Sequence, residues 1–189
     1  RDCWCDTGCD NTCKKRFDWK FNNLPYGYDH KYVYSSLGYN LKITDMQASV
    51  GLAQLKKQEN FINARKNNYL YLKKILKDLD DYFQLPSHQN KADPSWFGFP
   101  LLIKKDSICR NTLIKYLEAN HIKTRLIFAG NLMKQPYMKY QKFIKSGSYN
   151  NSDMIMNNGF WVGLYPGLTK EDLNNISYHL HYFINIVNR

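Results

Sequence analysis

The sequence has no long apolar run, no internal repeat and few acidic residues, and each absence narrows the class of protein. No stretch approaches the roughly 20 apolar residues that a membrane-spanning helix needs. The chain does not open with the basic, apolar and small-residue order of a signal peptide. We therefore expect a soluble protein of the cytoplasm with no membrane partner. No low-complexity tract is present either, and 43% hydrophobic residues suffice for a folded core.

Acidic residues are outnumbered, with 16 Asp and Glu against 27 Lys and Arg in 189 residues, a formal net charge of +11. Such an excess of positive charge is typical of proteins that bind nucleic acid or an anionic surface. The cations are spread along expected helices and loops, however, with no arginine-rich run and no nucleic-acid motif. We interpret most of them as solvated and predict no nucleic-acid partner. A secondary hypothesis assigns the basic group from Lys134 to Lys145 to docking an acidic protein or attracting a nucleotide diphosphate.

The pattern along the chain changes at Thr44. Residues 1–40 lack an apolar period and indicate loop with short extended pieces. Thr44 and Gln47 have the spacing of a capping box, and apolar residues then recur at helical spacing to about Leu79. This predicts one long helix, straight or kinked.

The pattern of the remaining residues, 80–189, predicts a compact α+β module. Alternation indicates a strand over 97–103, helical spacing indicates a helix over 111–119, and further strands are expected over 122–128 and 160–165. Residues 134–152 are polar and basic and are expected to be a loop. Thr169 and Asp172 cap a final helix. Its expected core positions are Leu173, Ile176, Leu180, Phe183 and Ile184.

Four of the five cysteines fall in the first thirteen residues, at Cys3, Cys5, Cys9 and Cys13. Disulfides suit small secreted chains, which this one does not resemble. A four-thiolate zinc site is a second possibility, although the cysteine spacing differs from the two Cys-x2-4-Cys pairs usual in zinc sites. An iron–sulfur cluster is a third, with three thiolates from this loop and one from elsewhere. Chance clustering is a fourth, and spacing alone does not decide. Because the chain opens with Arg1 and this cluster, we expect it to be a fragment of a longer protein.

Several long strings occur in the order found in one known family. These strings are 1–5, 8–13, 28–32, 38–48, 93–100, 128–132 and 135–136. Through them the chain resembles the C-terminal half of the CDP-4-keto-6-deoxy-D-glucose 3-dehydratase family, within the sugar aminotransferase superfamily related to DegT.

The resemblance implies an α/β fragment of the type I PLP-dependent transferase fold, which is aspartate aminotransferase-like. Residues 1–79 would be the end of the large domain, with the cysteine loop, a cofactor-phosphate segment and a connecting helix. Residues 80–189 would be the small C-terminal α+β domain. The implied cofactors are pyridoxamine or pyridoxal 5'-phosphate and a 2Fe–2S cluster, and the implied product is a 3,6-dideoxy sugar precursor of lipopolysaccharide O-antigen.

The resemblance also implies site residues. In that family the cluster is held by a Cys-x-Cys-x7-Cys run and one distant upstream cysteine, which places metal ligands at Cys3, Cys5 and Cys13 and leaves Cys9 as a spare thiol. Asn40 corresponds to a residue that reaches the cofactor phosphate of the neighbouring subunit, so a homodimer is implied. Lys42 stands where relatives have Arg, which keeps the charge but loses the bidentate fork.

The superfamily's aminotransferases carry His-Tyr where this chain has Ile127 and Phe128, a departure from transaminase chemistry. The stretch from Arg125 to Asn131 is expected to face the substrate. No catalytic base is assigned within this chain, because the family's base lies upstream of Arg1, and the chain alone is expected to be inactive. The implied partners are a CDP-sugar substrate and an NADH-dependent flavin iron–sulfur reductase.

Plainer interpretations apply to other conspicuous residues. His30 is expected to pack an interface, His179 and His181 to be surface or packing residues, Trp96 and Trp161 to lie in the core, and Cys109 to be a small buried residue. Two other functions remain open: a PLP-dependent sugar aminotransferase or cluster-free dehydratase of the same superfamily, and a zinc-stabilised basic binding module.

Overall fold

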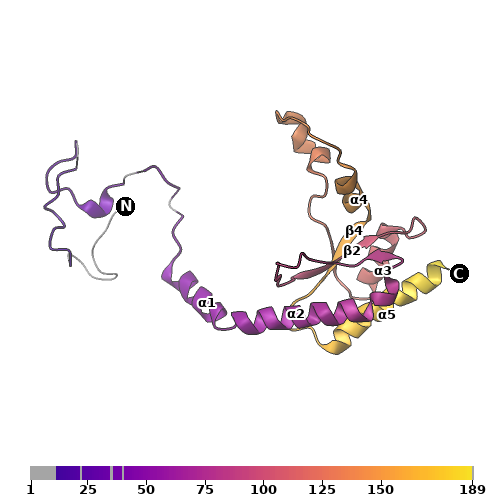
Figure 1. The fold of residues 1–189 in the computed structure, drawn as a ribbon. Coiled ribbons are helices and arrows are strands. Elements are labelled where there is room, and N and C mark those ends of the chain that lie inside the picture. Colours follow the sequence, from indigo (N-terminus) through magenta and orange to yellow (C-terminus); the bar gives the residue numbers. More distant parts are fainter. Residues whose placement is uncertain (1–11, 22, 35, 40, 189) are drawn as a thin grey trace. The chain divides into compact units, whose positions relative to one another are not determined.

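The computed structural model describes residues 12–21, 23–34, 36–39 and 41–188. The chain divides into two compact units, Arg1–Gly51 and Leu52–Arg189, whose elements are drawn in Figure 1. Cys3, Cys5, Cys9 and Asn40 lie outside the described residues. Among those described, no helix is long and apolar enough to cross a membrane.

In the first unit, the segment after Cys13 folds back on itself. Arg16 donates from Nε and Nη2 to Oδ2 of Asp29, at 2.9 and 2.7 Å. The ring of His30, in the 3-10 turn η1 (His30–Tyr32), is buried, and its Nδ1 lies 3.3 Å from the carbonyl oxygen of Arg16. Trp19 stacks on Phe21 with ring centroids 5.8 Å apart. Side-chain contacts therefore hold the expected loop in place. We call the segment from Cys13 to Tyr32 the braced loop.

The single helix expected between Thr44 and Leu79 is interrupted. It forms α1 (Asp45–Leu55), α2 (Gln58–Ile75) and the 3-10 turn η2 (Lys77–Leu79). The capping box at its start is confirmed, since the Thr44 amide donates to Oε1 of Gln47 at 2.9 Å and the Gln47 amide donates to the Thr44 hydroxyl at 3.3 Å. No side chain of α1 is buried.

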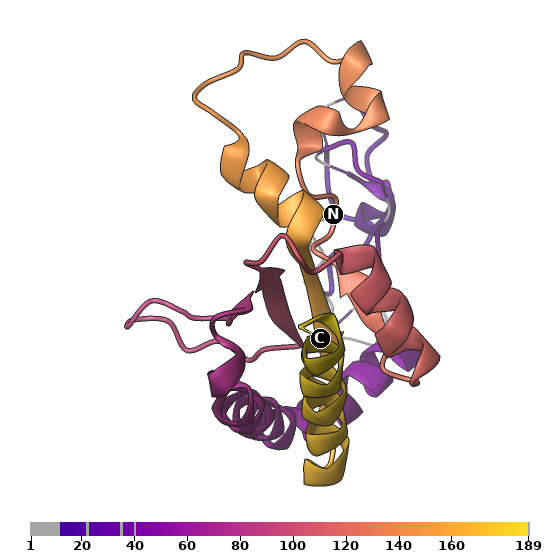
Figure 2. The same cartoon turned by 90° about the vertical axis from the view of Figure 1, so that its right-hand side faces the viewer.

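The second unit is built on a four-stranded antiparallel sheet in the order β1-β2-β4-β3. Its strands are β1 (Phe83–Gln84), β2 (Gly98–Ile103), β3 (Thr124–Leu126) and β4 (Gly159–Gly163). Three helices supply the core on one face, namely α2, α3 (Arg110–Ala119) and α5 (Lys170–Val187). Figure 2 shows α2 and α5 packed side by side.

Strand alternation decides which residues enter that core. On β2, Phe99, Leu101 and Ile103 are buried against the helices, whereas Pro100 and Leu102 belong to the other face. The expected core positions of α5 are confirmed, and so is its capping box, in which Thr169 and Asp172 exchange both hydrogen bonds.

Two parts of the second unit differ from the sequence prediction. Residues 134–152 contain the end of the 3-10 turn η3 (Leu132–Lys134), the whole 3-10 turn η4 (Pro136–Tyr140) and the start of α4 (Asn150–Asn158). The expected loop is therefore partly helical, and it projects from the rest of the unit (Figure 1). The strand expected over 122–128 is shorter, because the chain turns at Phe128.

The boundary between the two units lies after Gly51. The resemblance instead implied a large domain that ends at residue 79 and a small domain that begins at residue 80. Side chains of α2, including Tyr69 and Leu72, belong to the core of the second unit. The division of a whole enzyme into large and small domains at residue 79 stays a prediction.

Candidate functional site

An aromatic cluster occupies the sheet face turned away from α2, α3 and α5. The Phe97 and Trp161 rings meet edge to face with centroids 5.2 Å apart, and the Phe97 and Phe128 centroids are 6.4 Å apart. Trp161 is fixed by its Nε1, which donates to the Leu126 carbonyl oxygen at 3.1 Å. Phe97 and Phe128 are 54% and 76% exposed. We call these three rings the aromatic wall; exposed aromatic surface of this kind is typical of binding sites.

A cation lies on the same face as the aromatic wall. The sheet register pairs Arg125 of β3 with Trp161 of β4, and Trp161 with Pro100 of β2. Paired residues of an antiparallel sheet share a face, so the exposed Arg125 belongs beside the wall. Within the described residues no carboxylate forms an ion pair with Arg125. Its charge is available to an anionic ligand.

The loop after β3 holds Phe128 in an unusual conformation. Phe128 has φ of +45°, in the left-handed region that bulky residues rarely adopt. Its amide donates to the Leu126 carbonyl oxygen at 2.7 Å, and the Gly130 amide donates to the Ile127 carbonyl oxygen at 3.1 Å. The segment from Arg125 to Asn131, expected to face the substrate, therefore forms a tight turn that displays Phe128.

A polar network lies behind this turn. Asn131 is buried, and its Nδ2 donates to Oδ1 of Asp153 on α4 at 2.7 Å. Lys134 Nζ lies 2.9 Å from the same carboxylate oxygen. The hydrogen bond from Asn131 and then that from Lys134 lower the pKa of Asp153 below its ordinary value. The Asp153 carboxylate therefore joins the turn to α4.

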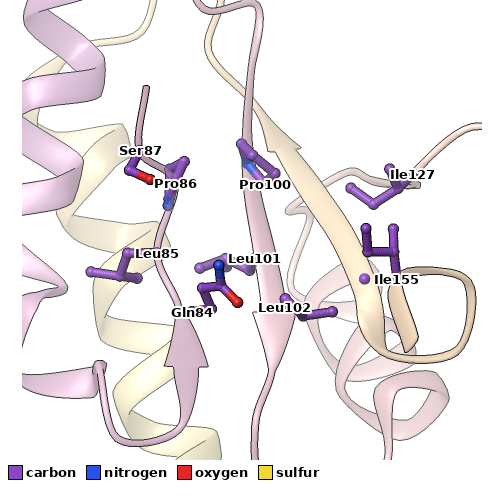
Figure 3. Close-up of a pocket in the computed structure, with 10 residues that line it drawn as sticks. Gln84, Leu85, Pro86, Ser87, Pro100, Leu101, Leu102, Ile127 and Ile155 are labelled. Atoms are coloured by element: carbon purple, nitrogen blue, oxygen red, sulfur yellow. The ribbon is translucent and has the colours of Figure 1, made fainter. Parts of the chain in front are cut away.

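Two hollows adjoin the site. A groove of about 240 Å³ runs along the open face of β2. Figure 3 shows it between Gln84 to Ser87 on one side and Ile127 and Ile155 on the other. No titratable side chain lines this groove, so it offers shape and apolar surface but no proton transfer.

The second hollow, of about 270 Å³, lies under the turn that carries Phe128 and includes Arg110, Gln135 and Asn157 in its lining. The Arg110 guanidinium donates from Nη1 to the carbonyl oxygen of Met156. Its polar groups can orient a ligand, but the hollow contains no carboxylate, histidine or thiol that could act as a base.

Of the predicted metal ligands, the structure describes Cys13 alone. It is half-buried at the start of the braced loop and precedes three consecutive cations, Lys14, Lys15 and Arg16. Cys3 and Cys5 lie outside the described residues, so a metal site shared with Cys13 stays a prediction. The prediction for Cys109 is wrong: this thiol is exposed at the N-cap of α3, and hydrogen bonds with Thr112 lower its pKa.

Lys42, predicted to bind the cofactor phosphate, is exposed in the segment without regular structure just before α1. A lysine beside a helix N-terminus suits an anion, since the helix presents unpaired amides there. Asn40 lies outside the described residues. The phosphate contacts of Asn40 and Lys42 therefore stay a prediction.

His30, His179 and His181 make local contacts, as expected of packing or surface residues. His30 is buried in the braced loop, His179 Nδ1 lies 2.9 Å from the hydroxyl of Tyr116, and His181 Nε2 lies 2.9 Å from Asp78. Trp96 packs against the core, as predicted, by stacking on Tyr69 at 5.0 Å. Trp161 was predicted to be core, but it belongs to the opposite face of the sheet.

Sequence reasoning missed the aromatic wall and the Asn131–Asp153 bond. The wall joins residues from three separate segments, which no local pattern can reveal. The dipeptide Gly130-Asn131 is a turn signal that could have drawn attention to the bend after β3.

Comparison with known proteins gives concordant matches. The pattern of the DegT/DnrJ/EryC1/StrS aminotransferase family matches residues 13–181. The chain is 54% identical over 177 residues to the lipopolysaccharide biosynthesis protein RfbH of Salmonella typhimurium, covering 93% of this chain and 40% of that protein. It is 44% identical over 177 residues to the dTDP-4-dehydro-2,6-dideoxy-D-glucose 3-dehydratase of Saccharopolyspora spinosa, covering 93% and 38%.

A solved structure agrees with these matches. The E. coli GDP-4-keto-6-deoxy-D-mannose-3-dehydratase with bound hydrated PLP superposes with a TM-score of 0.73 at 28% identity, over 90% of this chain and 46% of that one. This chain therefore spans about 40% of the length of the curated relatives and slightly more of the solved one.

Proposed function

Because the chain belongs to the DegT/DnrJ/EryC1/StrS aminotransferase family and has part of its type I PLP-dependent fold, we propose that it is the C-terminal part of a nucleotide-sugar 3-dehydratase. The substrate we propose is CDP-4-keto-6-deoxy-D-glucose, which loses its 3-hydroxyl on the way to 3,6-dideoxyhexoses of O-antigen. The observation that carries this proposal is the RfbH match, which extends along almost the whole chain.

The chemistry of the site supports dehydration over transamination. Where aminotransferases of the superfamily carry His-Tyr, this chain presents Ile127 and Phe128, which can neither donate nor accept a proton. The adjoining hollow likewise holds no base. These residues therefore bind, orient and exclude water, and the proton-transfer group belongs to a part of the enzyme outside this chain.

The described residues fit a pyridoxamine phosphate cofactor at one point. Lys42 supplies an exposed cation ahead of the α1 N-terminus, where a phosphate is favoured. In the proposed enzyme Asn40 and Lys42 hold the phosphate, reaching it across a homodimer interface. The bound cofactor supplies the electron sink for loss of the hydroxyl.

The neighbourhood of Cys13 fits a metal-binding cysteine. Three cations follow it directly, and their positive charge attracts the negative charge of a thiolate-bound cluster. The Arg16–Asp29 bonds and the buried His30 hold the segment after Cys13 in place. We propose that Cys3, Cys5 and Cys13 bind a 2Fe–2S cluster with a fourth cysteine from upstream, and that the cluster supplies single electrons for reduction.

Electron delivery requires a partner, which we propose to be an NADH-dependent flavin iron–sulfur reductase in the cytoplasm. The projecting segment around η4 supports an acidic partner, because no Asp or Glu occurs between Glu118 and Asp153. Lys139, Lys142 and Lys145 are all exposed there. Charge complementarity of this kind accelerates association.

The test begins with anaerobic iron, sulfide and zinc analysis and a visible spectrum, on the chain joined to the upstream sequence of its gene. We expect about two irons and two sulfides per chain with thiolate-to-iron absorption. Near-stoichiometric zinc would instead indicate a binding module, and an anaerobic preparation without metal would indicate a cluster-free relative.

The same protein is then incubated with pyridoxamine phosphate and CDP-4-keto-6-deoxy-D-glucose. We expect the sugar to lose its 3-hydroxyl, detected by mass spectrometry, and the 189-residue chain alone to give no turnover. Formation of a 4-amino sugar from an amino donor, without loss of the 3-hydroxyl, would contradict the proposal in favour of an aminotransferase.

A further inference from the structure

We propose that Asn131 is a positioning residue: through its bond to Asp153 it holds Phe128 in the conformation that completes the aromatic wall, against which the hexose ring of the substrate packs. The part of this inference that concerns the hexose rests on the proposed function. The part that concerns the conformation of Phe128 stands on the geometry of this chain alone.

The backbone conformation of Phe128 needs a restraint that its own side chain does not supply. A bulky residue at φ of +45° is strained, and strained residues persist only where their surroundings impose the conformation. Burial cannot impose it, because the side chain is 76% exposed. The restraint must therefore come from the backbone on either side of Phe128.

On the N-terminal side the restraint is the strand. Leu126 is the last residue of β3, its carbonyl oxygen accepts from the Phe128 amide at 2.7 Å, and the same oxygen accepts from Trp161 Nε1 at 3.1 Å. The carbonyl that fixes the backbone of Phe128 thus also fixes the indole of the aromatic wall.

On the C-terminal side the restraint is Asn131. The residue is 4% exposed, and both polar atoms of its side-chain amide form hydrogen bonds. Nδ2 donates to Asp153 at 2.7 Å, and Oδ1 accepts from the Met133 amide at 3.0 Å. A hydrogen bond to a carboxylate is stronger than one between neutral groups. Lys134 binds the same oxygen at 2.9 Å and completes the network.

Packing supports this network between Phe128 and Asn131. Gly130 has φ of +61° and lies against α4, where an added Cβ would come within 2.6 Å of Met156 Cγ. Gln135 Nε2 donates to the Ala129 carbonyl oxygen at 2.9 Å. The whole turn is therefore fastened to α4, and Asn131 is its one buried side-chain amide within the described residues.

The aromatic wall fits a sugar ring. Aromatic faces carry partial negative charge, which attracts the weakly positive C–H groups of a hexose. Arg125 on the same sheet face suits the diphosphate of a nucleotide sugar. A Phe128 released from its turn would leave Phe97 and Trp161 without their third ring.

The first test uses hydrogen–deuterium exchange on the 189-residue chain. In Asn131→Ala we expect the amides of residues 126–131 to exchange about ten-fold faster, since a bond to a charged acceptor is lost. The control is Asn120→Ala, which also removes one amide hydrogen bond, from Nδ2 to the Tyr116 carbonyl oxygen at 2.8 Å, but at the end of α3. We expect it to leave residues 126–131 unchanged.

Unchanged exchange in Asn131→Ala would overturn the proposed restraint. If Asn131→Ala does not fold, Asp153→Asn replaces it: that variant keeps an acceptor for Asn131 but loses the charge, and we expect a smaller acceleration in the same six residues. Equal exchange in Asp153→Asn and the unmodified chain would overturn the role of the carboxylate.

The second test is a double-mutant cycle in the enzyme completed with its upstream sequence. We expect Phe128→Ala and Asn131→Ala each to lower kcat about ten-fold, and the double variant to be no slower than Phe128→Ala, because Asn131 acts through Phe128. Multiplying effects would overturn the positioning role. No dehydration by the unmodified enzyme would overturn the hexose assignment and the proposed function, while the exchange result would still decide the restraint.

Discussion

The indole ring of Trp161 packs directly on Gly98, so closely that any Cβ at Gly98 would overlap the ring. Gly98 is paired in the β2–β4 ladder with Gly163, where an added Cβ would meet nothing within 4 Å. The two glycines face each other across one ladder but differ in their surroundings. Gly98 leaves the space that the Trp161 ring of the aromatic wall fills, whereas a side chain at Gly163 would meet no neighbour.

This difference gives a matched pair of variants. We expect Gly98→Ala to destabilise the fold by about 1–3 kcal/mol, because Trp161 must move out of a packed position. Gly163→Ala should be neutral or stabilising by up to about 1 kcal/mol, since alanine is less flexible in the unfolded chain. Urea unfolding of both variants measures the contrast, and equal losses would contradict the packing explanation.

Glu118 should make stability depend on acid pH. It accepts hydrogen bonds from Lys123 Nζ at 2.9 Å and from the Thr124 amide at 2.6 Å, and these bonds lower its pKa from 4.5 to about 2. A carboxyl with a lowered folded-state pKa stabilises the fold above its unfolded pKa and loses that effect as the pH falls. We therefore expect the stabilisation to disappear between about pH 4.5 and 2.

The measurement compares urea midpoints of Glu118→Gln and the unmodified chain across that pH range. Near neutral pH the variant should unfold at lower urea, and the difference should close as the pH approaches 2. Asp106→Asn, at an exposed turn position, is the control and should follow the unmodified chain. A difference between Glu118→Gln and the unmodified chain that is independent of pH would contradict the assignment.

Cys13 and Cys109 should behave oppositely toward iron. In the enzyme completed upstream, Cys13→Ser should abolish bound iron and the thiolate-to-iron absorption, because it removes a proposed ligand. Cys109→Ser changes an exposed thiol at the start of α3 and should retain the full iron content. Iron analysis after anaerobic purification decides, and iron retained in Cys13→Ser would exclude that ligand.

The lysines of the projecting segment should control partner association. Replacing Lys139, Lys142 and Lys145 by Glu should slow electron transfer from the reductase, because attraction becomes repulsion. The rate for the unmodified enzyme should fall as salt screens these exposed charges. Stopped-flow reduction at several ionic strengths measures both effects, and a rate independent of salt would argue against charge-driven docking.

The comparison of sequence with structure shows where local signals suffice. Thr169 and Asp172 cap α5 as predicted, because a capping box involves residues only three apart. The interruption between α1 and α2, at residues 56–57, contains no glycine or proline that would predict the end of a helix; residues 56–60 merely lack apolar side chains.

Other features could not be predicted because they depend on distant partners. The sequence of α4 is rich in Asn, a residue that disfavours helix interiors, and Asp153 of this helix is bonded to Asn131 in the turn after β3. The early end of β3 likewise follows from the turn at Phe128. The resemblance pointed to the segment from Arg125 to Asn131 as substrate-facing, which stays a prediction, but the arrangement of its side chains depends on the fold.

The strand order β1-β2-β4-β3 also governs how the second unit is made. β4 lies between β2 and β3 and is the last strand synthesised, so neither of its ladders exists until the ribosome has released it. Contacts between such distant residues give a high contact order and slow folding. Nascent chains that end before β4 would expose Phe99 and Leu101 without a partner strand, which makes them clients for chaperones.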